Sequence, residues 1–120
     1  MHFTKLVPNV FYADIRDGLS LFVDCLQFSI GHDERHAEHP FCVLEKNELH
    51  INLFQDPALA KEHQPEFRLV TNDIEEVYQT IASSHTEFLH PNLSTITLRP
   101  WGAKEFALRD KQVCIVIQQW

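Results

Sequence analysis

The sequence predicts a single α+β domain over residues 1–120, made of two βαβββ halves in tandem, at about 1–58 and 59–120. Two helix starts indicate the duplication: Asp14 and Asp73 each precede an apolar pattern of helical period, and they lie 59 positions apart. Each start follows one β-like run and precedes three more, so the element order repeats. Because 120 residues match the usual size of one domain, the two halves are expected to form a single domain together.

The first half is expected to open with a strand over 5–12 and to continue with a helix that Asp14 caps, since Asp is a favoured N-cap residue. The apolar residues of this helix repeat on one face: Ile15, Leu19, Phe22 and Leu26. Three β-like stretches follow, at 27–31, 41–46 and 49–55. The third alternates apolar and polar residues, as a strand with two different faces does. Loops are expected at 32–40 and at 56–65, the latter linking the halves.

The second half is expected to open with a strand over 66–71, followed by a helix that Asp73 caps, with Glu76 at capping-box spacing. One face of this helix is apolar: Ile74, Val77, Tyr78 and Ile81. Strands are predicted at 86–90, 105–109 and 113–119, and loops at 91–102 and 110–112. The predicted order is therefore again βαβββ.

Charge and composition exclude several classes of partner. A net charge of −7 argues against nucleic acid and anionic membranes, which are bound through clustered Lys and Arg. No apolar run has the length of a membrane span, and no signal peptide is recognisable, so a cytoplasmic protein is expected. The three cysteines lie in apolar contexts and are expected to be buried, reduced thiols: Cys25, Cys42 and Cys114.

Two sequence runs carry a family resemblance: the run from Arg99 to Asp110, Arg-Pro-Trp-Gly-Ala-Lys-Glu-Phe-Ala-Leu-Arg-Asp, and the run from Leu21 to Phe28. They resemble motifs of the vicinal oxygen chelate superfamily, which includes glyoxalases, bleomycin-resistance proteins and extradiol dioxygenases. The first run resembles the segment before the last hairpin of that fold, and the second the end of its first helix, with Gln27 where the family has glycine. The last turn of the family is also shortened here, at 110–113.

Among the subfamilies, bleomycin-resistance proteins are the most similar. Three runs resemble strands of those proteins: Val7-Pro8-Asn9-Val10, Glu48-Leu49-His50-Ile51 and Phe67-Arg68-Leu69-Val70-Thr71. The resemblance implies curved mixed sheets that form a cleft, and a homodimer that sequesters a cationic glycopeptide at the subunit interface without chemical conversion. It further implies that Phe67 stacks on the ligand and that Pro8 is associated with exchange of the N-terminal strand between subunits.

Enzymes of this superfamily hold a divalent metal ion, but the resemblance places apolar residues at most of the ligand positions. Val7 matches the position in the first strand, and Val116 or Ile117 the position in the last strand. We therefore expect no metal and no other cofactor, since hydrocarbon side chains do not coordinate cations. If the alignment with the family is shifted, His50, His63, Glu66 and Glu105 could supply metal ligands. A loop with His32, His36 and His39 is a second, weaker candidate for a metal site.

Six residues are expected to line a ligand cavity: Phe41, His50, Asn52, Phe54, Phe67 and Trp101. The alternative for Phe41 and Phe54 is packing in the core or in a dimer, and for Trp101 a place at the rim or at an interface. The favoured function is non-catalytic binding of a small, cationic or aromatic molecule, with no catalytic residue. The first alternative is a metal-dependent glyoxalase, dioxygenase or thiol transferase. The second is half of a hetero-assembly, or a domain whose cavity is vestigial.

Overall fold

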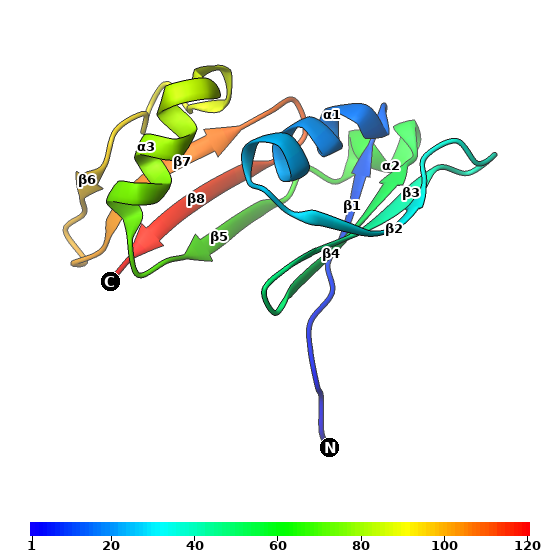
Figure 1. Ribbon diagram of the computed structural model, residues 1–120, viewed down its shortest axis with the longest axis horizontal. Coiled ribbons are helices and arrows are strands. Elements are labelled where there is room, and N and C mark those ends of the chain that lie inside the picture. Colours follow the sequence, from blue (N-terminus) through cyan, green and yellow to red (C-terminus); the bar gives the residue numbers. More distant parts are fainter. The chain divides into compact units, whose positions relative to one another are not determined.

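The computed structural model describes residues 1–120, and the chain divides into two compact units, Met1–His63 and Gln64–Trp120. Each unit contains one four-stranded mixed sheet together with helices (Figure 1). None of the helices is both long enough and apolar enough to cross a lipid bilayer.

Unit 1 contains the first βαβββ motif and one further helix. Its elements are β1 (Asn9–Tyr12), α1 (Ile15–Leu19), η1 (Ser20–Cys25), β2 (Ser29–Glu34), β3 (Phe41–Lys46), β4 (Leu49–Gln55) and α2 (Pro57–Glu62). The π-helical turns of η1 continue directly from α1. The sheet order is β1-β4-β3-β2, in which β1 is parallel to β4 and the other neighbours are antiparallel.

Unit 2 repeats this arrangement. Its elements are β5 (Glu66–Val70), α3 (Ile74–Ser84), the 3₁₀-helix η2 (Thr86–Phe88), β6 (Thr97–Leu98), β7 (Lys104–Arg109) and β8 (Cys114–Gln119). The sheet order is β5-β8-β7-β6, again with the first strand parallel to the last one. The predicted tandem of two βαβββ motifs is therefore confirmed.

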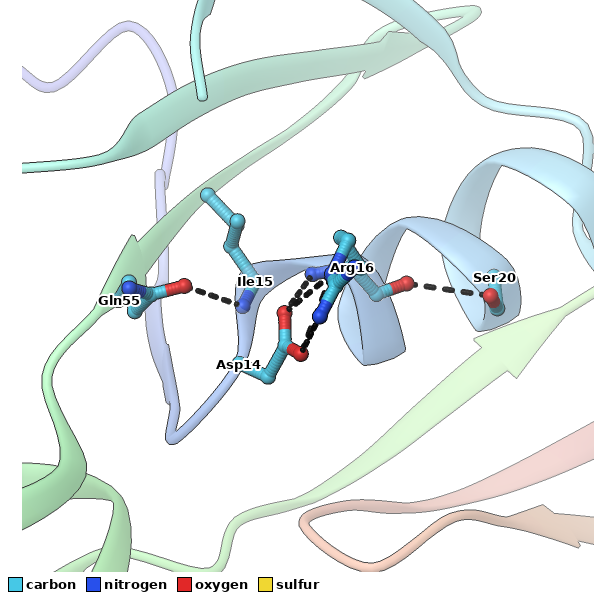
Figure 2. A network of polar contacts seen from close by, with 5 residues as sticks. All are labelled: Asp14, Ile15, Arg16, Ser20 and Gln55. Atoms are coloured by element: carbon cyan, nitrogen blue, oxygen red, sulfur yellow. Dashed lines mark hydrogen bonds and ion pairs between the residues drawn. The ribbon is translucent and has the colours of Figure 1, made fainter. Parts of the chain in front are cut away.

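Both predicted N-caps are present. The carboxylate of Asp14 accepts a hydrogen bond from Arg16 N at 3.0 Å, and that of Asp73 accepts one from Glu76 N at 3.2 Å. These bonds satisfy amide donors that the first turn of a helix leaves without partners. The carboxylate of Asp14 also accepts hydrogen bonds from the guanidinium of Arg16, so it binds both the backbone and the side chain of that residue at the start of α1 (Figure 2).

A glutamine at the end of the last strand provides a second, repeated cap. Gln55 Oε1 accepts from Ile15 N at 3.0 Å in unit 1 (Figure 2), and Gln119 Oε1 accepts from Ile74 N at 2.7 Å in unit 2. Each bond joins the first helical residue to the strand that pairs in parallel with the strand before the helix. The duplication therefore extends to individual hydrogen bonds.

Each sheet buries one face against its helix. In unit 1 a Cβ placed on Gly18 would lie 2.6 Å from the Tyr12 ring and 3.0 Å from Leu53, so α1 covers the face that these side chains share. Six sheet residues on this side are at most 6% exposed: Val10, Tyr12, Cys42, Leu44, Ile51 and Leu53. In unit 2 the ring of Tyr78 on α3 meets that of Phe106 edge-on, at 5.0 Å between centroids. The core of each unit therefore lies between one helix and one sheet face.

Several predicted boundaries were wrong. Thr86–His90 is not a strand, because η2 occupies 86–88 and only one isolated bridge, from Leu89 to Leu108, follows. Strand β6 lies inside the predicted loop 91–102 and has only two residues. The predicted linker at 56–65 contains α2, which Asp56 caps through a hydrogen bond from Leu59 N, with Pro57 in its first turn.

The other differences concern strand length. Strand β1 begins at Asn9 rather than at residue 5, and the last backbone bond ahead of it joins Asn52 N to the carbonyl of Pro8. Strand β2 runs on to Glu34 through an irregularity between Ile30 and His32, so the predicted loop at 32–40 starts later. These positions lack a local signal because pairing with a neighbouring strand determines where each strand ends.

Gln27 has a left-handed backbone, with φ of 64°, at the exit from the first helix. Glycine adopts this conformation without the clash that a Cβ atom causes, which explains glycine in the corresponding motif of the superfamily. We expect Gln27→Gly to raise the free energy of unfolding by about 0.5–1 kcal/mol, measured by urea denaturation. Asn47, with φ of 55°, is the control, because Asn tolerates this region and Asn47→Gly should gain less. A stability gain at Asn47 equal to that at Gln27 would contradict the explanation.

Candidate functional site

The face of sheet 1 that points away from α1 carries a row of phenylalanine rings. Successive side chains of a strand alternate between faces, so His50, Asn52 and Phe54 lie opposite the buried Ile51 and Leu53. The register pairs Phe54 with Phe11 on one side and with Phe41 on the other. The rings stack at 5.8 Å for Phe11 and Phe54, and at 6.0 Å for Phe41 and Phe54. All three rings are half-buried.

Histidines extend this row at both ends. His32 lies 5.5 Å from Phe41, and His63 lies 6.1 Å from Phe11, measured between ring centroids. The row therefore contains five rings drawn from β2, β3, β4, β1 and the C-cap of α2. We call this surface the aromatic face; its residues are Phe11, His32, Phe41, Val43, His50, Asn52, Phe54 and His63.

Carboxylates and amides flank the rings. Glu34 pairs with Phe41 in the register and its carboxylate lies 3.1 Å from His32 Nε2, while Glu45 lies 3.9 Å from His50 Nδ1. Asn52 donates a hydrogen bond of 3.1 Å to the side chain of Asn9. The aromatic face thus combines flat apolar rings with negative charge, an arrangement suited to contact with a cationic ring.

The corresponding face of sheet 2 carries a polar cluster instead. Glu105 on β7 is 2% exposed, and its Oε2 accepts hydrogen bonds from Gln118 Nε2 at 2.6 Å and from Trp101 Nε1 at 3.1 Å. Two guanidinium groups lie beside the same carboxylate: Arg68 at 3.7 Å and Arg99 at 3.6 Å. We call this surface the arginine face; its residues are Arg68, Arg99, Trp101, Glu105, Val116 and Gln118.

The two faces contain five of the six predicted lining residues. Phe41, His50, Asn52 and Phe54 share the aromatic face, and Trp101 belongs to the arginine face, where it is 52% exposed. Phe67 is placed elsewhere: the register aligns it with Ile115 and Leu108, on the side of sheet 2 that α3 covers. A role for these residues in ligand binding stays a prediction.

The segment before β1 carries exposed apolar side chains. Met1, Phe3 and Leu6 are at least 80% exposed, and the chain enters the sheet where Asn52 N binds the Pro8 carbonyl. Val7 precedes β1, whereas Val116 lies in β8 opposite Arg68 and Ala107. Neither valine can coordinate a cation.

Metal-binding and nucleophilic side chains do not assemble into a site. No group of three or more His, Cys, Asp or Glu side chains is placed so that it could hold a metal ion, and this includes the histidines at 32, 36 and 39. None of the three cysteines forms a disulfide. Burial, reinforced by the carboxylate of Asp33 at 3.4 Å, raises the pKa of the Cys42 thiol to about 11. Burial likewise raises the pKa of Cys114, so both side chains stay protonated near neutral pH.

Sequence reasoning missed several residues of these faces. Phe11 is half-buried on the four-residue strand β1, and the alternation of that strand with Val10 and Tyr12 is a signal for its face. Arg68 and Arg99 lie in runs that resemble the family, but no pattern marked them or Gln118 as residues of a site. The pairing of β5 with β8 and of β8 with β7 brings Arg68 and Gln118 to Glu105, and the turn before β7 brings Arg99 there.

No family model and no curated protein sequence matches the chain. Solved structures match it over nearly its whole length. A bleomycin-binding protein complexed with bleomycin is 22% identical, with 98% of this chain and 99% of that chain covered and a TM-score of 0.72. A bleomycin resistance determinant encoded on the transposon Tn5 is 22% identical, with 98% of each chain covered and a TM-score of 0.71. A protein of the glyoxalase/bleomycin resistance protein/dioxygenase superfamily from Sphaerobacter thermophilus is 16% identical, with 98% of each chain covered and a TM-score of 0.69.

The chain has an α+β fold of two tandem βαβββ units. In each unit one face of the sheet packs against a helix, and the other face bears aromatic or charged groups. The bleomycin-binding proteins and the protein of the glyoxalase/bleomycin resistance/dioxygenase superfamily described above share this fold. The resemblance found in the sequence motifs is thereby confirmed at the level of the fold.

Proposed function

We propose that the protein binds a small cationic aromatic molecule on the aromatic face and releases it chemically unchanged. The observation that carries this proposal is the stack of Phe11, Phe54 and Phe41, with Glu34 beside it as the register partner of Phe41. A flat ring can extend such a stack, and a positive charge on that ring is attracted by the ring faces as well as by the carboxylate.

The energetics favour a cation over a neutral ring. One cation–π contact contributes about 0.5–2 kcal/mol, depending on how far water is removed. The net charge of −7 adds a long-range attraction that raises the local concentration of cations. Both terms have the same sign, so affinity for a cation should exceed that for a neutral ring of the same shape.

Similarity to known structures supports the binding of a small molecule. One protein with the same fold is a bleomycin-binding protein whose structure was solved in complex with bleomycin. We further propose a homodimer. In it the segment before Pro8, which carries the exposed side chains of Met1, Phe3 and Leu6, contacts the second copy of the chain. A cytoplasmic location accords with three cysteines that form no disulfide.

The test compares two probes on the full chain. Isothermal titration with 1-methylquinolinium and with the neutral quinoline should give tighter binding of the cation. Phe54→Ala should weaken 1-methylquinolinium binding by about 10-fold, because Phe54 is the middle ring of the stack. Bleomycin is titrated in parallel as a larger cationic probe.

Phe88→Ala is the matched control. Phe88 is also a half-buried phenylalanine beside a histidine, His85 at 6.3 Å, but it lies in η2 and outside the aromatic face. Its removal should leave the affinity for 1-methylquinolinium within about 2-fold of the original. Absence of binding by both cationic probes, or equal losses in the two variants, would show the proposal to be wrong.

A further inference from the structure

The arginine face has a local charge opposite to that of the whole protein. Arg68 and Arg99 contribute two positive charges beside the single buried carboxylate of Glu105. Glu66 also approaches Arg68, at 3.9 Å, and both of these side chains are more than half exposed, so water screens the pair. Arg99 is less exposed, at 35%, and Glu105 is the one carboxylate that it approaches.

Arg99 has a hydrogen-bond donor that the protein does not use. Its Nε is shielded from solvent and has no hydrogen-bond partner. The nearest carboxylate oxygen, Glu105 Oε1, lies at 3.6 Å, which is beyond hydrogen-bond length. Both bonds that Glu105 accepts are on its other oxygen, from Trp101 and Gln118. Because a solvent-shielded atom is closed to a ligand, the exposed part of the same side chain, about a third of it, is what can offer N–H donors to an acceptor from outside the chain.

Trp101 places a flat surface next to this donor. The guanidinium carbon of Arg99 lies 4.8 Å from the centre of the Trp101 ring, and the ring is held by its own bond to Glu105. Arg99 keeps 35% of its side chain exposed and Trp101 keeps 52% of its surface exposed, so both remain accessible to a ligand. A guanidinium beside an aromatic ring presents planar donors for an oxyanion together with a stacking surface.

We propose that Arg99 and Trp101 form a subsite for a carboxylate carried on a planar ring, with Arg68 adding attraction for the same anion. The carboxylate accepts hydrogen bonds from the guanidinium of Arg99, and the ring rests on Trp101. The subsite belongs to unit 2, whereas the aromatic face belongs to unit 1.

Isothermal titration with two probes of the same shape tests the subsite on the full chain. We expect 2-naphthoate to bind about 10-fold or more tightly than the neutral 2-naphthamide. Arg99→Gln should reduce this preference to within about 2-fold, and Arg99→Lys should weaken it by at least about 3-fold, because lysine keeps the charge but lacks the planar fork. Lys111→Gln is the matched control, since it removes one positive charge from an exposed turn of unit 2 and should leave the preference unchanged.

A second measurement locates the probe. In Trp120→Phe the only remaining indole N–H belongs to Trp101, and its NMR signal should shift on addition of 2-naphthoate. Equal affinity for 2-naphthoate and 2-naphthamide, an equal loss in Lys111→Gln, or an unmoved indole signal would overturn the proposal. Phe54→Ala separates the two proposals, because it should weaken 1-methylquinolinium binding and leave 2-naphthoate binding as it was.

Discussion

Replacing Phe106 by alanine should lower the free energy of unfolding by about 3–5 kcal/mol, the range for loss of a fully buried phenylalanine. Phe106 is 0% exposed in the middle of β7 and meets Tyr78 of α3 edge-on at 5.0 Å. The substitution removes apolar area from the core of unit 2 and leaves a cavity between helix and sheet. Urea denaturation followed by circular dichroism measures the change.

Phe54→Ala is the matched comparison for this prediction. Phe54 has the same side chain, also on an interior strand of its sheet, but it lies half-buried on the face without the helix. We expect it to cost about 1–2 kcal/mol, since part of its area is already in contact with water. Similar losses at the two positions would mean that the aromatic face is part of the hydrophobic core, and the binding proposal would lose its basis.

Patterns that are local in the chain predicted the repeat correctly. Each helix start depends on a capping aspartate and an apolar face within a dozen residues, and both caps are present at Asp14 and Asp73. Strands β3 and β4 have the predicted bounds. Each of them has a neighbouring strand on both edges, so the residues with strand-like sequence are also the residues that pair in the sheet. Local and non-local preferences agree at these positions.

Edge elements were less predictable. Strand β6 has two residues, Thr97 and Leu98, and exists only because β7 supplies Glu105 and Lys104 as partners. Thr86–His90 has strand-like composition, yet no continuous partner lies beside it and it closes as a 3₁₀ turn. Propensity is a weak guide where a segment has at most one neighbour in the sheet.

The residues of the candidate sites also differ in whether a local sequence pattern or the pairing of distant segments determines their place. Alternation along β4 placed His50, Asn52 and Phe54 together, and the structure has them on one face. The motif that contains Phe67 does not tell which face of the sheet this residue occupies, whereas the register with Ile115 places it on the face covered by α3. The contact of Arg99 with Glu105 joins residues six positions apart across the turn before β7, and no periodic pattern marks such a pair.

Replacing Glu105 by alanine should also be strongly destabilising, by about 2–4 kcal/mol. The change leaves Gln118 Nε2 and Trp101 Nε1 without their acceptor, and Gln118 is 6% exposed. It also leaves Arg68 and Arg99 without the carboxylate that they approach at 3.7 and 3.6 Å. Partial exposure of both guanidinium groups keeps the expected cost below that of a fully buried, broken ion pair.

Glu105→Gln separates the charge of this side chain from its hydrogen bonds. The amide oxygen can still accept from Gln118 and Trp101, so the variant should lose only about 1–2 kcal/mol in urea denaturation. An equal loss in both variants would assign the whole effect to charge, and no loss in Glu105→Ala would show that the cluster does not stabilise sheet 2. Because Glu105→Gln removes the negative charge beside Arg99 and keeps an acceptor for Trp101, this variant should also bind 2-naphthoate more tightly than the original protein, as isothermal titration can measure.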